Sequence, residues 1–198
     1  MVAVHRWWDG ATKRVLVIGN VHGDERAGLR VVRRLRHSAV PRGTDLWLVR
    51  SMNPDGLASG RRTNAHRVDL NHNFPRWWVR AGRGTTAWSG PSAASEPETR
   101  HVIALVRRIR PALTVVIRQP LHGVDSSRAK SPATVRALAR ESRLPLRSFA
   151  CHGRCHGALI KWHDRAVQGS GAGVWMGQRA PLGRVFRVAR AVLRVGMR

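Results

Sequence analysis

The chain contains no tyrosine, only three lysines among its 36 basic residues, and only 11 acidic residues. Its formal net charge is therefore +25, and almost all of the positive charge belongs to arginine. A charge of this size predicts nonspecific attraction to polyanions such as nucleic acids, acidic cell-wall polymers and anionic membrane surfaces. The arginines are scattered among many alanines and glycines, so biased codon usage accounts for them better than a dedicated nucleic-acid motif.

Long apolar runs are also absent. No run approaches the length of a membrane-spanning helix, so no membrane span is expected. The N-terminus has no basic segment followed by an apolar core, so we expect no signal peptide. Apolar residues make up 42% of the 198 residues, which excludes a disordered chain and suits one domain with a full core. The sequence carries no marker of the compartment or of the oligomeric state.

Cysteine is scarce, and both copies lie in the short segment Cys151-His-Gly-Arg-Cys155-His. Two cysteines this close can form a local disulfide, remain as free thiols, or join the neighbouring histidines around a metal ion. We favour the disulfide or the free thiols over a metal site in this segment.

Strand-like and helix-like segments alternate along the chain, which predicts an α/β fold. The expected architecture is a single domain with a mixed, mostly parallel central sheet and helices on both faces. The predicted strands cover residues 2–6, 14–18, 45–50, 113–117 and 173–176. The predicted helices cover residues 24–36, 96–110, 131–142 and 181–195. Between them, residues 51–86 form a long polar loop, and a loop of that size in a compact domain is usually functional.

The first chemical signal is the pair His22 and Glu25. The preceding residues Val15–Ile18 are short, apolar and mostly β-branched, which predicts a buried strand. His22 and Glu25 therefore lie just beyond the carboxyl end of a strand, where open α/β sheets bind their ligands. An imidazole and a carboxylate at this spacing can supply two of the ligands of a zinc ion.

Further short blocks follow in order along the chain. They are Asn53-Pro54-Asp55-Gly56, Arg62-Thr63-Asn64, Val68-Asp-Leu-Asn-His-Asn-Phe-Pro75, Ser89-Gly90-Pro91, Ser95-Glu-Pro-Glu98 and Gln119-Pro120-Leu121. Together with His22 and Glu25, these blocks resemble the carboxypeptidase A-type zinc metallopeptidases, and in particular the small bacterial branch that includes murein peptide amidases. The resemblance runs from about Val2 to Val195. It implies one zinc carboxypeptidase-like domain over residues 1–198, shortened at its N-terminus relative to the family.

The resemblance assigns roles to five residues. His22 and Glu25 align with the first two zinc ligands of the family. Arg62 aligns with the catalytic arginine that polarises the scissile carbonyl group. Asn71 and His72 stand where the family has an Asn-Arg pair that binds a substrate carboxylate. Since a histidine lacks the bidentate fork of arginine, we expect weaker carboxylate binding here. The implied cofactor is zinc, and the implied substrate is a peptide, with cell-wall peptides as one class.

The third zinc ligand of the family is a histidine directly before Gln-Pro, and this chain has Arg118 there. A guanidinium stays protonated and is not a metal ligand. We expect Arg118 to form a salt bridge with Glu25 that replaces the metal. The best substitute ligand is His122, four residues further on, although a solvated loop histidine is the simpler interpretation.

The general-base glutamate of the family is replaced as well. The matching segment places Trp175 at that position, and an indole has no basic atom to accept a proton. Acidic residues are absent after Asp164, so a shift of the alignment within this segment does not recover a carboxylate.

Three functions follow from these observations. The resemblance implies a metallopeptidase that hydrolyses peptide bonds, and the substitutions predict that this activity is impaired. The alternative is a catalytically silent homologue that binds peptides or cell-wall material without tightly bound zinc. The third is an arginine-rich nucleic-acid binder, for which the sequence contains no recognition motif.

Overall fold

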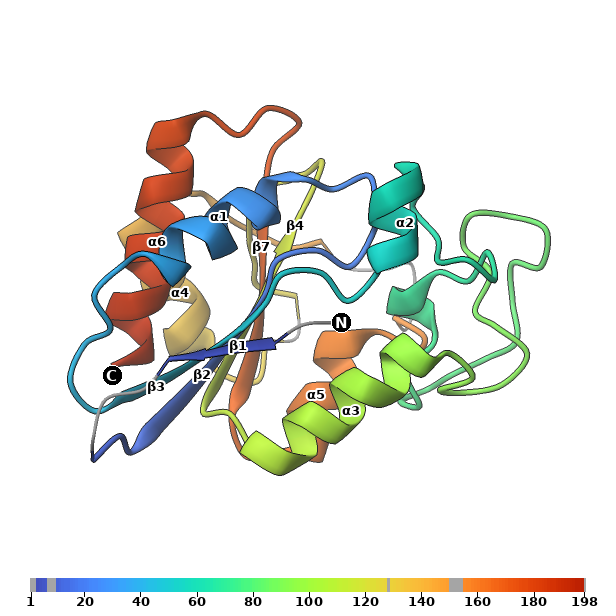
Figure 1. The fold of residues 1–198 in the computed structure, drawn as a ribbon, viewed down its shortest axis with the longest axis horizontal. Coiled ribbons are helices and arrows are strands. Elements are labelled where there is room, and N and C mark those ends of the chain that lie inside the picture. Colours follow the sequence, from blue (N-terminus) through green and yellow to red (C-terminus); the bar gives the residue numbers. More distant parts are fainter. Residues whose placement is uncertain (1–2, 7–9, 128, 150–154, 198) are drawn as a thin grey trace.

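The computed structural model describes residues 3–6, 10–127, 129–149 and 155–197. The strands within these residues are β1 (Ala3–Arg6), β2 (Lys13–Ile18), β3 (Thr44–Val49), β4 (Leu113–Arg118), β5 (His122–Asp125), β6 (Leu146–Arg147) and β7 (Ser170–Met176). They form one seven-stranded sheet in the order β1-β3-β2-β4-β7-β5-β6 (Figure 1).

The sheet is mixed and mostly parallel, as the sequence predicts. Strand β2 pairs in parallel with β3 and β4, β4 with β7, and β5 with β6. Only the β1–β3 and β5–β7 pairs in the described residues are antiparallel. The helical elements are α1 (Ala27–Arg36), α2 (Pro54–Ser59), the 3₁₀ helix η1 (Leu70–His72), α3 (Pro97–Ile109), α4 (Pro132–Ser142), α5 (Leu159–Ala166) and α6 (Leu182–Gly196).

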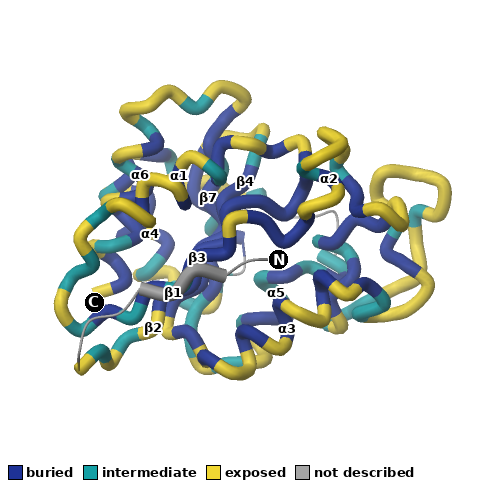
Figure 2. The backbone as a smooth tube through the Cα atoms, viewed as in Figure 1, coloured by how far each residue is buried: buried dark blue, intermediate teal, exposed yellow. Residues whose placement is uncertain are grey.

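Strand β2 shows how helices cover both faces of the sheet. Val15 and Val17 belong to a buried cluster with residues of α1, α4 and α6. Leu16 and Ile18 belong to a second cluster with residues of α3 and α5. Because successive side chains of a strand point to opposite faces, a strand buried on both faces is apolar throughout. Figure 2 shows the resulting buried centre with exposed helix surfaces around it. The predicted fold class is therefore confirmed.

Helix α1 corrects one predicted boundary. The prediction placed its start at residue 24, whereas the helix begins at Ala27. The side-chain amide of Asn20 donates hydrogen bonds to the backbone carbonyl groups of His22 and Glu25. These bonds hold residues 22–25 in a turn before the helix. Glu25 is therefore a loop residue beyond the carboxyl end of β2.

Five short elements were missing from the prediction: α2, η1, α5, β5 and β6. The predicted loop over residues 51–86 contains α2 and η1. Asn53 caps α2 by accepting a hydrogen bond from the backbone N–H of Gly56 at 2.9 Å. Gly23 makes this arrangement possible, because a Cβ there would lie 1.9 Å from the carbonyl carbon of Gly56. In the described part of the chain, no helix is long and apolar enough to cross a membrane.

Candidate functional site

The candidate site lies at the carboxyl ends of three adjacent parallel strands. His22 and Glu25 follow β2, Arg118 is the last residue of β4, and Trp175 is the penultimate residue of β7. The register pairs Arg118 directly with Trp175. Parallel pairing therefore brings together residues that are far apart in the sequence. His22, Glu25 and Arg118 are all buried.

His22 is held between two carboxylates. Its Nδ1 lies 2.8 Å from Oε1 of Glu25, and its Nε2 lies 3.0 Å from Oδ1 of Asp69. Burial by itself would raise the pKa of Asp69, but the hydrogen bond with His22 and the charge of Arg62 hold that pKa far below its usual value. Asp69 thus stays ionised and orients the imidazole so that Nδ1 faces Glu25.

Asp69 received no role in the sequence analysis, although it lies within one of the quoted blocks. A carboxylate on the far nitrogen of a histidine is the usual outer partner of a metal-binding imidazole. The geometry of His22 and Asp69 therefore matches that of a metal site, whatever occupies the position in front of Nδ1. The sequence signal that could have pointed to Asp69 is its position at the start of a mostly polar segment, directly after the buried Val68.

Arg118 forms the ion pair with Glu25 that the sequence analysis expects. Its Nε donates to Oε2 of Glu25 at 3.1 Å, and its Nη2 lies 3.2 Å from Nδ1 of His22. Burial would raise the pKa of Glu25, but the charge of Arg118 and the hydrogen bond with His22 hold it below its usual value. The carboxylate is therefore ionised and is neutralised by the guanidinium.

Arg62 contacts the same imidazole nitrogen as Arg118 does. Its Nε and Nη2 donate to Oδ2 of Asp69 at 3.0 and 2.7 Å, and its Nη1 lies 2.9 Å from Nδ1 of His22. About a third of its side chain, 34%, is exposed. Arg62 therefore remains accessible from solvent, whereas Arg118 is enclosed.

These residues do not fit a zinc ion as they are arranged. A catalytic zinc site needs three protein ligands. Among the described residues, no group of three or more His, Cys, Asp or Glu side chains is arranged to hold a metal. The guanidinium groups of Arg62 and Arg118 already balance the carboxylates of Glu25 and Asp69. A divalent cation would therefore add positive charge that nothing compensates.

Trp175, which the resemblance places at the general-base position of the family, packs against Arg118. The guanidinium carbon of Arg118 is 4.5 Å from the centroid of the Trp175 ring. The ring also contacts Phe149 in an edge-type arrangement, at a centroid distance of 5.4 Å. The nearest acidic residue in the sequence, Asp164, is used to accept a hydrogen bond from the backbone N–H of Gly171. Trp175 thus has a packing role and no means of accepting a proton.

Asn71 and His72 lie in the short helix η1, next to Asp69. The backbone N–H of Asn71 donates to Oδ1 of Asp69, and Nε2 of His72 lies 3.9 Å from Oδ2 of the same carboxylate. Burial lowers the pKa of His72, in opposition to the charge of Asp69. The structure therefore places both residues beside the site, while their role in substrate binding stays a prediction.

The other candidate residues do not join this centre. His122 begins β5 and is exposed, and no described group of metal-binding side chains includes it. Its role as a substitute ligand stays a prediction. Cys155 is disulfide-bonded, which agrees with the expectation of a disulfide. Cys151 lies outside the described residues.

A sequence comparison gives this centre its context. The profile of the zinc carboxypeptidase family matches residues 5–127, more than half of the chain. The chain therefore belongs to the zinc carboxypeptidase family, whose members depend on zinc.

Individual relatives point to one branch of this family. Murein peptide amidase A of Escherichia coli K12 is 31% identical over 125 residues, which cover 57% of this chain and 52% of that protein. Murein peptide amidase A of Vibrio campbellii is 29% identical over 148 residues, which cover 69% of this chain and 59% of that protein. The chain thus spans a little over half the length of these curated relatives.

Solved structures share the fold. The murein-tripeptide amidase of Escherichia coli O157 superposes with a TM-score of 0.75 at 24% identity, over 92% of this chain and 81% of that chain. Carboxypeptidase A of Helicoverpa armigera superposes with a TM-score of 0.75 at 16% identity, over 93% of this chain and 61% of that chain. At these identities the likeness establishes the fold alone.

Proposed function

We propose that this chain is a peptide-binding member of the zinc carboxypeptidase family whose zinc-dependent hydrolysis is impaired. The observation that carries this proposal is the ion pair between Arg118 and Glu25. It places a guanidinium against His22 and Glu25, the two residues to which the resemblance assigns the role of zinc ligands. The metal position is thereby closed by an internal salt bridge.

The proposed ligand class is a peptide with a free carboxylate, and cell-wall peptides are the first candidates. The names of the relatives from Escherichia coli and Vibrio campbellii support the cell-wall class. Partial exposure of Arg62 and His72 supports an open side of the site. A guanidinium at such an opening favours carboxylate binding through charge-assisted hydrogen bonds.

The first test is the zinc content per chain, measured by elemental analysis after zinc loading and dialysis. We expect no stoichiometric zinc in the unaltered chain and close to one zinc per chain in Arg118→His. Arg118→Lys is the matched control, since it keeps the positive charge and should remain free of zinc. About one zinc in the unaltered chain would overturn the proposal and make His122 the first candidate for the missing ligand.

The second test separates binding from hydrolysis. A murein-derived tripeptide is titrated into the unaltered chain by calorimetry, and its cleavage is followed by chromatography. Binding without cleavage, weakened by Arg62→Gln, is the expected result. Cleavage by the unaltered chain that is abolished by dialysis against a chelator would contradict impaired zinc-dependent hydrolysis, and absence of binding would remove the peptide from the proposal.

A further inference from the structure

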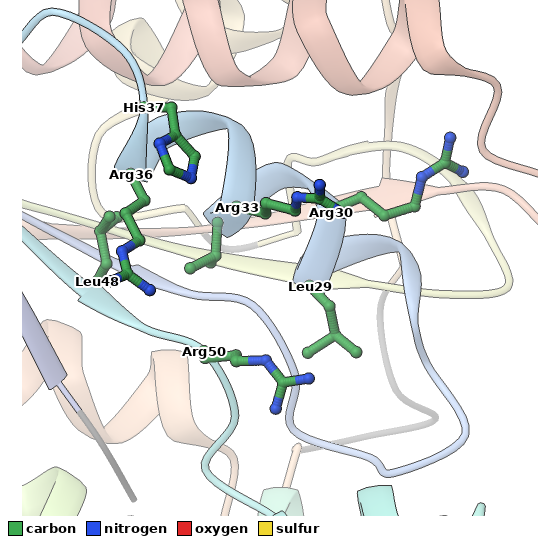
Figure 3. A pocket seen from close by; sticks show the side chains of 8 residues that line it. Leu29, Arg30, Arg33, Arg36, His37, Leu48 and Arg50 are labelled. Atoms are coloured by element: carbon green, nitrogen blue, oxygen red, sulfur yellow. The ribbon is translucent and has the colours of Figure 1, made fainter.

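A second concave region lies along helix α1, away from the candidate site. It is a pocket of about 480 Å³ between α1 and the end of β3. Its lining residues are Leu29, Arg30, Val32, Arg33, Arg36, His37, Leu48 and Arg50. Figure 3 shows the basic side chains of α1 along one side, with Leu48 and Arg50 across from them.

The pocket continues into a second one at the start of α1. This adjoining pocket, of about 530 Å³, shares Leu29 and Arg50 with the first and adds Arg26, Ser51, Pro54, Leu57 and Ala58. Together they form an elongated depression, here called the α1 groove. Its lining combines apolar residues, among them Leu29 and Leu48, with several arginines. None of the residues that surround His22 lines it.

Several arginines of the α1 groove have no carboxylate partner among the described residues. Neither pocket has a carboxylate among its lining residues, and α1 itself contains no acidic residue. Arg62, Arg118, Arg140 and Arg194 form ion pairs with carboxylates, and Arg36 also has an interaction partner. Arg26, Arg33 and Arg50 are therefore outside all of these pairs. Arg30 differs, because its Nη1 donates to the backbone carbonyl of Ala180 and it extends away from Arg50 (Figure 3).

We propose that the α1 groove binds the phosphodiester backbone of nucleic acid without sequence preference. Guanidinium groups match phosphate oxygens in geometry and charge, and a row of them follows a backbone rather than a single ion. The apolar lining residues Leu29 and Leu48 suit contact with the sugars of the nucleic acid. No Phe or Trp is among the described lining residues, so the groove lacks a platform on which bases stack.

A lipid surface fits this groove less well. Membrane-surface binding combines basic residues with exposed apolar side chains that enter the bilayer interface. The exposed apolar residues nearest in the fold, Leu182 and Phe186 on α6, are not among the lining residues of the α1 groove. Nucleic acid is therefore the occupant that the charge and shape favour.

The test measures binding of a short labelled DNA duplex by fluorescence anisotropy over a series of salt concentrations. The groove variant is Arg33→Gln with Arg50→Gln. The control is Arg107→Gln with Arg136→Gln, which removes the same charge from exposed positions on α3 and α4. Each lost phosphate contact should reduce the slope of log affinity against log salt by about 1, so the groove variant should lose about 2 and the control none.

Other outcomes would overturn the proposal. Equal losses in the groove variant and in the control would show that binding follows net charge only. Binding of anionic vesicles that depends on Arg33 and Arg50, with no groove dependence for DNA, would assign the groove to lipid instead. Circular dichroism of both variants is the control for folding. Because no residue of the candidate site is changed, this test is independent of the proposed peptide binding.

Discussion

Arg118 and Trp175, which the resemblance places at the positions of a zinc ligand and a general base, lie against each other. They are partners in the register of β4 and β7, and the guanidinium carbon lies 4.5 Å from the ring centroid. A guanidinium over an indole face is an attractive cation–π contact. The two substitutions therefore form one structural unit in which Trp175 positions the cation that neutralises Glu25.

The ion pair between Arg118 and Glu25 should be required for stability once it is present. Arg118→Met leaves the buried Glu25 carboxylate without its main counter-charge, so we expect a loss of about 3–5 kcal/mol in the free energy of unfolding. The double variant with Glu25→Gln should lose less than the sum of the two single variants. Urea denaturation of the unaltered chain, the two single variants and the double variant measures this coupling. Strict additivity of the losses would show that the ion pair contributes no interaction free energy to stability.

Asp69 should matter to a metal only after Arg118 is replaced. In the Arg118→His background, Asp69→Asn removes the carboxylate that orients His22, and we expect zinc affinity to fall about 10–100-fold. The matched control is Asp55→Asn, an exposed carboxylate on α2. Competition with a chromogenic chelator measures the affinity. Unchanged affinity in Asp69→Asn would show that the contact of 3.0 Å with His22 does not orient the ring.

Restoring hydrolysis should require both positions. Arg118→His should regain zinc yet remain inactive, because Trp175 offers no proton acceptor. The double variant Arg118→His with Trp175→Glu should cleave the murein-derived tripeptide. Trp175→Gln in the same background is the control, since it has the shape of glutamate without its basicity. Equal activity in the Glu and Gln variants would show that the base lies elsewhere.

The pair His66 and Glu96 predicts a pH dependence of stability away from the site. Nδ1 of His66 lies 2.7 Å from Oε2 of Glu96, and this contact raises the pKa of His66 above 6.5. Burial would raise the pKa of Glu96, but hydrogen bonds from Ser95, Asn64 and His66 lower it below 4.5. The His66 contribution is complete below 6.5 and is lost as pH rises through the raised value. The Glu96 contribution is present above 4.5 and is lost on acidification.

His66→Gln should therefore destabilise the protein more at mildly acidic than at alkaline pH. The side chain of His66 is 69% exposed, so the difference should stay below about 1 kcal/mol. His101→Gln, which changes another exposed histidine, is the control. Denaturant titrations on both sides of neutral pH provide the measurement. A larger effect of His66→Gln at alkaline pH would reverse the sign and contradict the assignment.

The packing of α1 against β2 depends on two glycines. A Cβ on Gly28 would lie 1.6 Å from the backbone oxygen of Gly19, which cannot move without shifting the strand. Gly28→Ala should therefore cost about 1–3 kcal/mol or more. Gly183→Ala in α6 is the matched control, because its Cβ would meet only the end of the Arg187 side chain, at 3.5 Å. That change should be neutral or stabilise the helix by about 0.5–1 kcal/mol. Thermal unfolding of both variants measures these changes in stability.

Periodic apolar patterns predicted the larger elements well. Val185, Val188, Ala189 and Val192 recur on one side of α6, and all four are buried. The predictions failed for β6 and α2, which are two and six residues long, because so few residues carry no readable period. The start of α1 was misplaced because the Asn20 side chain holds the preceding turn, and such a bond leaves no periodic trace.

The sequence by itself determined the α/β class and the order of the main strands and helices along the chain, and it predicts that Arg118 and Trp175 replace a histidine ligand and a glutamate base. These properties follow from local composition and from side-chain chemistry at single positions. The tertiary structure decided which contacts the residues of the site make with one another. Glu25 and Arg118 are 93 positions apart, and only the parallel pairing of β2 with β4 brings their charges into contact. Likewise, Asp69 acquires its role because the fold places it on the far nitrogen of His22.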